Sequence, residues 1–189
     1  MIISFKGFEK TERIADKQNG PVCWLEAIEN LVQLDNPYIS NDFSEKLIRA
    51  MIEDNYQGYN PQKRNVRDAH IHYPEILRAC GIEADWYNFD HDFLRSVLQQ
   101  NRGVFLMGFC QFLQQYNGQQ DTHAIVLTDA KIDGQNCLWY YGIDSNFPKT
   151  TCYWPWNQIQ DFALSYVNTW HLPALLVTRK PMRWPHKNS

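Results

Sequence analysis

The chain has 189 residues, 44% of them hydrophobic, and a formal net charge of −3. A chain of this length is typical of one domain that can bury a core without the help of disulfides or metals. A charge so near zero gives no electrostatic basis for binding a nucleic acid or an anionic membrane, so we expect neither partner.

The start of the chain and its cysteines limit the cellular setting. The opening run MIISFKGFEKTER is interrupted by Lys6 and Glu9, unlike a secretory signal, and no stretch approaches the roughly 20 apolar residues of a membrane span. We therefore expect a soluble protein, cytoplasmic or exported by a route that the sequence does not display. The cysteines are odd in number, with no spacing typical of zinc, which predicts reduced thiols and no metal site. They are Cys23, Cys80, Cys110, Cys137 and Cys152.

The N-terminal part, about residues 1–100, shows helical patterns. Trp24, Ile28 and Leu31 recur at helical spacing, and Pro21 suits a first helical turn. The polar stretch 55–73 reads as a long surface excursion. The predicted helices are 21–32, 41–54, 74–80 (ended by Gly81) and 90–100.

The C-terminal part, about residues 101–180, changes to short apolar runs that are typical of strands. A glutamine-rich loop extends through Gly118, and Asp133-Gly134 predicts a tight turn. The predicted strands are 104–109, 123–127, 137–143 and 172–178. Helices first and strands later indicate an α+β fold in one domain over residues 1–189, with a cleft between its layers.

The strongest local pattern surrounds Cys23, where residues 18–24 read QNGPVCW. A cysteine in the first turn of a helix has its thiolate favoured by the helix dipole and by unpaired backbone N–H groups. The Cys23 backbone N–H could stabilise an oxyanion, and the Gln18 side chain, five residues upstream, could supply a second donor. The alternative is a buried core cysteine, which is the usual state of a free thiol.

A second pattern surrounds His123, where residues 121–128 read DTHAIVLT. The histidine begins an apolar run with strand character, which would fix its imidazole at the end of a sheet. The other five histidines lie in polar loops, in the tail or near element ends. His123 is therefore the candidate base, and a satisfied core or surface histidine is the alternative.

Two residues compete for the place beside His123. If Asp133-Gly134 form a two-residue type I′ turn, position 123 faces position 144 across the hairpin. Asp144 could then accept the Nδ1–H of the histidine and leave Nε2 for a thiol. If the turn is Gly134-Gln135, Asn146 takes that place. A third interpretation of Asp144 is a turn residue that ends a strand.

These segments resemble the papain-like cysteine peptidases. In that family a Gln precedes a Cys-Trp or Cys-Gly pair that opens the central helix, a His-Ala-Val-x-Val strand follows, and a later strand ends in Asn or Asp before a small polar residue. The likeness is to compact bacterial types such as the bacteriocin-leader-processing and staphopain-like peptidases. It covers residues 18–25, 123–128 and 140–146, with a weaker likeness over 95–109, and it favours Asp144 over Asn146.

The resemblance implies a papain-like fold and a cysteine peptidase, or another thiol hydrolase, that acts on a protein or peptide through an acyl-cysteine. It implies no cofactor. The aromatic segment 153–156 would wall the cleft, or it packs a loop onto the core. The implied catalytic residues are Cys23, His123, Asp144 and Gln18, and the implied substrate-binding residues are Trp24, Asn146 and Trp154.

Other functions use the same residues. A deamidase, an acyltransferase and a hydrolase of ubiquitin-like tails also form an acyl-cysteine. A catalytically inactive binding module that keeps the fold is the alternative outside enzymes. A role as an effector or toxin follows by analogy with compact enzymes of this kind. Nucleic-acid binding through Lys63, Arg64, Arg67 and the tail is weakly supported, because these basic residues are few.

Overall fold

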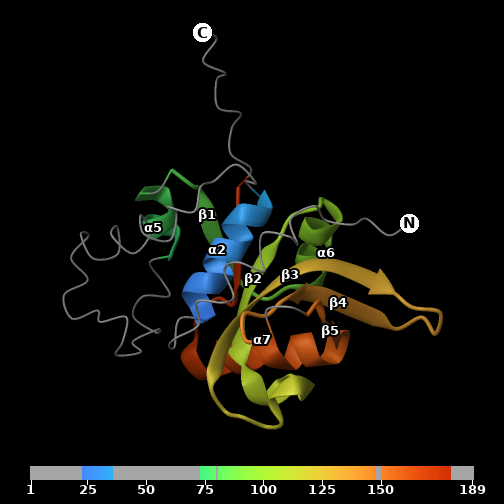
Figure 1. The fold of residues 1–189 in the computed structure, drawn as a ribbon. Coiled ribbons are helices and arrows are strands. Elements are labelled where there is room, and N and C mark those ends of the chain that lie inside the picture. The colour runs from blue at the N-terminus through green and yellow to red at the C-terminus, as the bar shows by residue number, and fades with distance from the viewer. Residues whose placement is uncertain (1–22, 36–72, 80, 148–149, 180–189) are drawn as a thin grey trace.

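The computed structural model of the chain describes residues 23–35, 73–79, 81–147 and 150–179 (Figure 1). Gln18, the predicted helix 41–54 and nearly all of the predicted excursion 55–73 lie outside the described residues. The described part combines helices with antiparallel strands, which confirms the predicted α+β class.

A six-stranded sheet forms the centre of the described part, and all its neighbouring strands run antiparallel. Along the sheet the order is β1-β6-β2-β3-β4-β5. The strands are β1 (Ala84–Tyr87), β2 (Val104–Phe109), β3 (Thr122–Ile132), β4 (Leu138–Ile143), β5 (Cys152–Pro155) and β6 (Leu175–Thr178). Because β1 pairs with β6, segments far apart in the sequence meet in one sheet.

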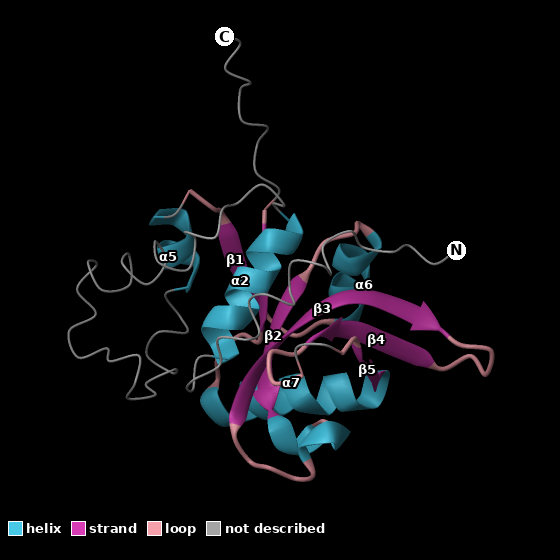
Figure 2. Cartoon of the chain, viewed as in Figure 1, coloured by secondary structure: helices cyan, strands magenta, loops and turns pink. Residues whose placement is uncertain are grey.

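Helices pack around this sheet, as Figure 2 shows. They are α2 (Cys23–Asp35), α5 (Tyr73–Ala79), α6 (His91–Gln99) and α7 (Trp156–Trp170), with 3₁₀ turns η3 (Cys110–Phe112) and η4 (Gln114–Tyr116). Asp90 caps α6, since its side chain accepts a hydrogen bond from the Phe93 backbone N–H at 2.7 Å. The predicted helices near 21–32, 74–80 and 90–100 are thus present in the described residues.

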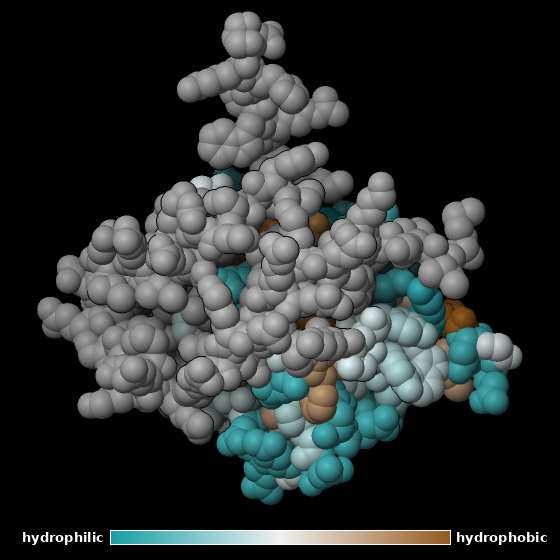
Figure 3. Space-filling view, viewed as in Figure 1, coloured by the Kyte–Doolittle hydropathy of each residue, from teal (hydrophilic) through white to brown (hydrophobic). Residues whose placement is uncertain are grey.

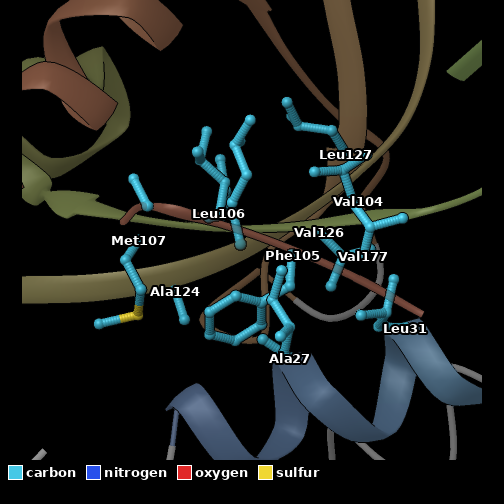
Figure 4. Packing of buried hydrophobic residues seen from close by; sticks show 14 of the residues in the cluster. Ala27, Leu31, Val104, Phe105, Leu106, Met107, Ala124, Val126, Leu127 and Val177 are labelled. Carbon is cyan, nitrogen blue, oxygen red and sulfur yellow. The ribbon is translucent and has the colours of Figure 1, made fainter. Parts of the chain in front are cut away.

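The helices α2 and α7 cover opposite faces of the sheet. A Cβ added at Gly103 would contact Leu31 of α2, whereas one added at Gly108 would contact the Phe162 ring of α7. Within β2, Phe105, which lies on the α2 side (Figure 4), and Gly108 are three positions apart, and positions an odd number apart on a strand face opposite sides. The two helices therefore lie on the two faces of the sheet. Figure 4 shows Phe105 on the side of the sheet that faces Ala27 of α2, while Leu106 points to the other side.

Three elements were not predicted: β1, β5 and α7. Buried residues of α7 recur at helical spacing (Ile159, Phe162, Ala163 and Tyr166), but polar and aromatic residues between them obscure the stripe. The strands β1 and β5 span four residues each, which is too short for a clear alternation. Because β1 lies before residue 100 and α7 after it, each part of the chain contributes to both the helices and the sheet of the described residues.

The visible surface of the described residues is mostly hydrophilic (Figure 3). Hydrophobic surface gathers at the end of the β3–β4 hairpin, where Ile132 is 57% exposed. Among the described residues, no helix combines the length and the apolar character that crossing a membrane requires.

Candidate active site

Cys23 is the first residue of α2, and its side chain is half-buried. The helix forms because Trp24, Ile28 and Leu31 bury one stripe against the sheet, each at most 2% exposed. Packing of that stripe holds the N-terminal end of α2 in place. A helix end presents backbone N–H groups without intrahelical partners, so Cys23 stands where an anion is favoured.

His123 is the second residue of β3 and is 2% exposed. It pairs with Gly108 of β2, next to the place where the Phe162 ring fills the space of a side chain. Its Nε2 lies 2.8 Å from Asp144 Oδ1. The strand therefore places the imidazole at the edge of the core, against a carboxylate that is itself 0% exposed.

Asp144 reaches His123 by a route that differs from the predicted one. The pairs Ile132↔Leu138 and Val126↔Ile143 define the hairpin, with an irregularity between Leu127 and Asp129. The ladder ends at the Val126↔Ile143 pair, and Asp144 follows directly after β4. The predicted pairing of positions 123 and 144 through a two-residue turn is therefore wrong, although the structure still brings the two side chains together.

The hairpin end explains the register. The Asp133 carboxylate accepts hydrogen bonds from the backbone N–H groups of Gln135 and Cys137, at 2.8 and 2.9 Å. Asp133 also donates its own N–H to the Cys137 carbonyl, and Asn136 takes a left-handed conformation with φ 62°. These bonds stabilise a loop longer than the two residues of a type I′ turn.

Hydrogen bonding and charge outweigh burial at His123. Burial by itself lowers the pKa of this histidine, but hydrogen bonds with Asp144 and with Cys23, and the negative charges of both, raise it to about 10. The Cys23 sulfur is thus close enough to the ring to act on the pKa of His123. The arrangement favours a protonated imidazole between a carboxylate and a sulfur.

The two ring nitrogens of His123 have different partners. Because Nε2 faces Asp144, the nitrogen left for Cys23 is Nδ1. The prediction that Asp144 would bind Nδ1 and leave Nε2 for the thiol is therefore wrong. The geometry still suits proton transfer, since one nitrogen is held by the carboxylate and the other serves the sulfur.

The other described cysteines differ from Cys23. Burial and the nearby Asp144 raise the pKa of the Cys110 and Cys152 thiols to about 12. Cys137 is exposed and its Sγ lies 3.9 Å from the Gln135 carbonyl oxygen. Among these four thiols, Cys23 has the histidine partner, and all four are free of disulfides.

The remaining predicted site residues take other positions. Trp24 is 2% exposed and stacks on Tyr73 at a centroid distance of 5.2 Å, and Trp154 is 0% exposed. Both indoles lie in the core and present no open surface to a substrate, which differs from the prediction. Asn146 is exposed and does not hold His123, but its backbone N–H donates to Asp144 Oδ1 at 3.0 Å.

Sequence reasoning missed Tyr116 and Gln115, which come from the glutamine-rich loop. The Tyr116 hydroxyl lies 2.8 Å from His123 Nε2 and 2.8 Å from Asp144 Oδ2. Gln115 donates to Asp144 Oδ2 at 3.4 Å and accepts from the Trp154 indole at 2.9 Å. No periodic pattern marks a loop that folds back on a site, and the nearness of this loop to His123 in sequence was the one available signal.

Comparisons of the chain with protein families, with curated proteins and with solved structures found no match. Within the described ranges, no group of three or more His, Cys, Asp and Glu side chains is arranged to hold a metal ion.

Proposed function

We propose that this chain is a cysteine peptidase with a papain-like fold, in which Cys23 is the nucleophile, His123 the acid and base, and Asp144 the group that orients the histidine. The observation that carries the proposal is a buried imidazole whose Nε2 lies 2.8 Å from a carboxylate oxygen, and whose pKa is raised by that carboxylate and by a cysteine at a helix N-terminus. Such a chain of thiol, imidazole and carboxylate is what nucleophilic catalysis by cysteine requires.

The fold gives this proposal further support. A helix that opens with the cysteine packs on one face of an antiparallel sheet, and β3 and the end of β4 of that sheet carry the histidine and the aspartate. These elements follow in the order expected from the resemblance to the compact bacterial peptidases. Gln18, which lies outside the described residues, remains the proposed second oxyanion donor beside the Cys23 N–H.

In the first half of the reaction, the Cys23 thiolate attacks the carbonyl carbon of a peptide and forms a C–S bond. The protonated Nδ1 of His123 gives its proton to the leaving nitrogen as the C–N bond breaks. In the second half, a water molecule gives a proton to Nδ1 and its oxygen attacks the thioester carbon. The C–S bond then breaks, which releases the acid and restores the thiolate and the imidazolium.

Alkylation by iodoacetamide, followed by peptide mass spectrometry, tests the reactive pair without a known substrate. At mildly acidic pH we expect Cys23 to react faster than the other cysteines, because thiolate is the reactive form. His123→Ala should slow it, whereas the matched change at the exposed His171 should leave it unaltered. Exposed Cys137 is the internal standard, and labelling of Cys23 no faster than Cys137 in every variant would sink the proposal in favour of an inactive binding module.

A second experiment separates the reactions that share an acyl-cysteine. The protein is incubated with a library of peptides from a digested cell extract, and the products are sequenced by mass spectrometry. New N-termini that disappear in Cys23→Ala indicate a peptidase. A change of glutamine to glutamate without cleavage indicates a deamidase, and joined peptides indicate an acyltransferase, and either product would overturn the peptidase assignment.

A further inference from the structure

The Tyr116 hydroxyl sits among four polar atoms of the candidate site. It lies 2.8 Å from His123 Nε2, and 2.9 and 2.8 Å from the two carboxylate oxygens of Asp144. Asn146 donates its side-chain N–H to the same hydroxyl at 3.0 Å. The phenol therefore touches both the histidine and the carboxylate that orients it.

The protons of this cluster can be assigned by counting donors and acceptors. A tyrosine hydroxyl has one proton to donate and two lone pairs that accept. Burial, with the charge and hydrogen bond of Asp144, raises the pKa of Tyr116 far above its usual range, so the phenol stays neutral. Its proton goes to the carboxylate, and its lone pairs accept the Asn146 amide and the His123 Nε2–H.

This assignment fixes which nitrogen of the histidine keeps its proton when the ring is neutral. A lone pair on Nε2 would face the acceptor oxygen of Asp144 at 2.8 Å, which is repulsive. Nε2 must therefore carry a proton, and that proton is shared between Asp144 Oδ1 and the phenol oxygen. Nδ1 is then the nitrogen that exchanges a proton with the Cys23 sulfur.

The Oδ2 oxygen of the carboxylate depends on the phenol, whereas Oδ1 also has His123 Nε2 and the Asn146 backbone N–H as partners. Asp144 is 0% exposed, so water does not satisfy it. Its Oδ2 accepts from Tyr116 at 2.8 Å and otherwise from Gln115 at 3.4 Å, which is a long contact. Without the hydroxyl, Oδ2 would keep one weak donor, and the carboxylate could turn away from the ring.

We propose that Tyr116 is a positioning residue of the site, whose hydroxyl holds the Asp144 carboxylate and shares the His123 Nε2–H so that Nδ1 is presented to Cys23. This inference rests on the proposed function. Tyr116 acts through Asp144 and His123 and makes no contact with the reacting bond. Its ring also packs edge-on against Phe147 at a centroid distance of 5.6 Å, a contact that Phe at position 116 would keep.

Tyr116→Phe tests the proposal, with Tyr153→Phe as the matched control, since Tyr153 is 56% exposed. We expect Cys23 alkylation to slow about tenfold in Tyr116→Phe, the size of one hydrogen bond to a charged group. The Nε2–H resonance of His123 should move downfield. In the variant this proton has Asp144 Oδ1 as its acceptor, and the carboxylate no longer accepts from a Tyr116 hydroxyl, so the hydrogen bond from Nε2 becomes stronger. Tyr153→Phe should change neither quantity.

The nuclear magnetic resonance arm needs neither a substrate nor a reactive thiol, so it decides about Tyr116 even if Cys23 proves inert and the proposed function fails. An Nε2–H resonance and an alkylation rate that are both unchanged in folded Tyr116→Phe would overturn the inference. If that variant does not fold, the wild-type protein supplies the test. A nuclear Overhauser contact between the His123 Nε2–H and the Tyr116 ring protons supports the inference, and its absence overturns it.

Discussion

Asp144→Asn removes one charge from the buried pair while keeping the shape of the side chain. In the wild-type protein, Asp144 and His123 are 0% and 2% exposed, and Oδ1 and Nε2 lie 2.8 Å apart. Asn retains an oxygen that can accept the Nε2–H. The substitution therefore removes the charge of Asp144 with little disturbance of the packing. It also replaces Oδ2, which accepts from Tyr116 and Gln115, with an N–H donor.

The size of the effect follows from the pKa of His123, which is raised from 6.5 to about 10. A histidine whose pKa is higher in the folded than in the unfolded state stabilises the fold. This contribution is complete at a pH below the pKa of the unfolded state, and it is lost as the pH rises through the pKa of the folded state. The difference between the two pKa values corresponds to at most about 5 kcal/mol of the free energy of unfolding, and part of this comes from Cys23. We expect Asp144→Asn to lower the free energy of unfolding by about 3 kcal/mol near pH 6. Near pH 10.5, where the His123 ring of the wild-type protein is mostly neutral, we expect the same substitution to lower the free energy of unfolding by about 1 kcal/mol.

Urea unfolding of both proteins, followed by tryptophan fluorescence at several pH values, measures this difference. Groups away from Asp144 titrate alike in the two proteins and cancel. Cys110 and Cys152 do not, because Asp144 helps to raise the pKa of both thiols, and their change also makes the effect of Asp144→Asn smaller at high pH. Asp129→Asn is the control, because Asp129 is half-buried and pairs with Lys131 at 3.0 Å, and it should cost less than about 1 kcal/mol. An Asp144→Asn effect that stays constant over the pH range would refute the charged pair.

Substitutions at Gly108 and at Asp90, each with a control, test how the fold is supported. Gly108→Ala would place a Cβ against the Phe162 ring, so we expect a loss of about 1–3 kcal/mol in urea unfolding. Gly134→Ala, which meets open space, should change stability by less than about 0.5 kcal/mol, and equal losses at both glycines would contradict the close packing. Asp90→Ala removes the cap that accepts from the Phe93 N–H at 2.7 Å and should cost about 1 kcal/mol in thermal unfolding. Asp90→Ser should retain most of that stability, and a Ser variant no better than Ala would show that the cap contributes little.

Local patterns in the sequence were enough to predict several elements. The spacing of Trp24, Ile28 and Leu31 predicts the helix that opens near Cys23, because one buried stripe requires helical periodicity. The apolar run after His123 predicts a buried strand, and the structure extends it to Ile132. These features depend on neighbours within a few residues, which is the range over which periodicity operates.

The sequence also brought Asp144 into consideration, but for a reason that the structure does not support. The prediction took the ladder as regular from the turn to the site. The Asp133 side chain instead organises a longer loop, and the irregularity after Leu127 shifts the register again. Each shift depends on hydrogen bonds that a two-residue periodicity does not encode.

The sequence by itself determined which residues have the chemistry of a thiol site: a cysteine at the start of a helix and a histidine at the start of a strand. Only the tertiary structure decided which atoms of these residues contact one another and which other residues contact them. It assigned Nε2 of His123 to Asp144, buried Trp24 and Trp154 in the core, and brought Tyr116 from a loop onto the carboxylate. These outcomes depend on contacts between segments distant in the sequence, where packing and hydrogen-bond satisfaction, and not local propensity, fix the positions of the atoms.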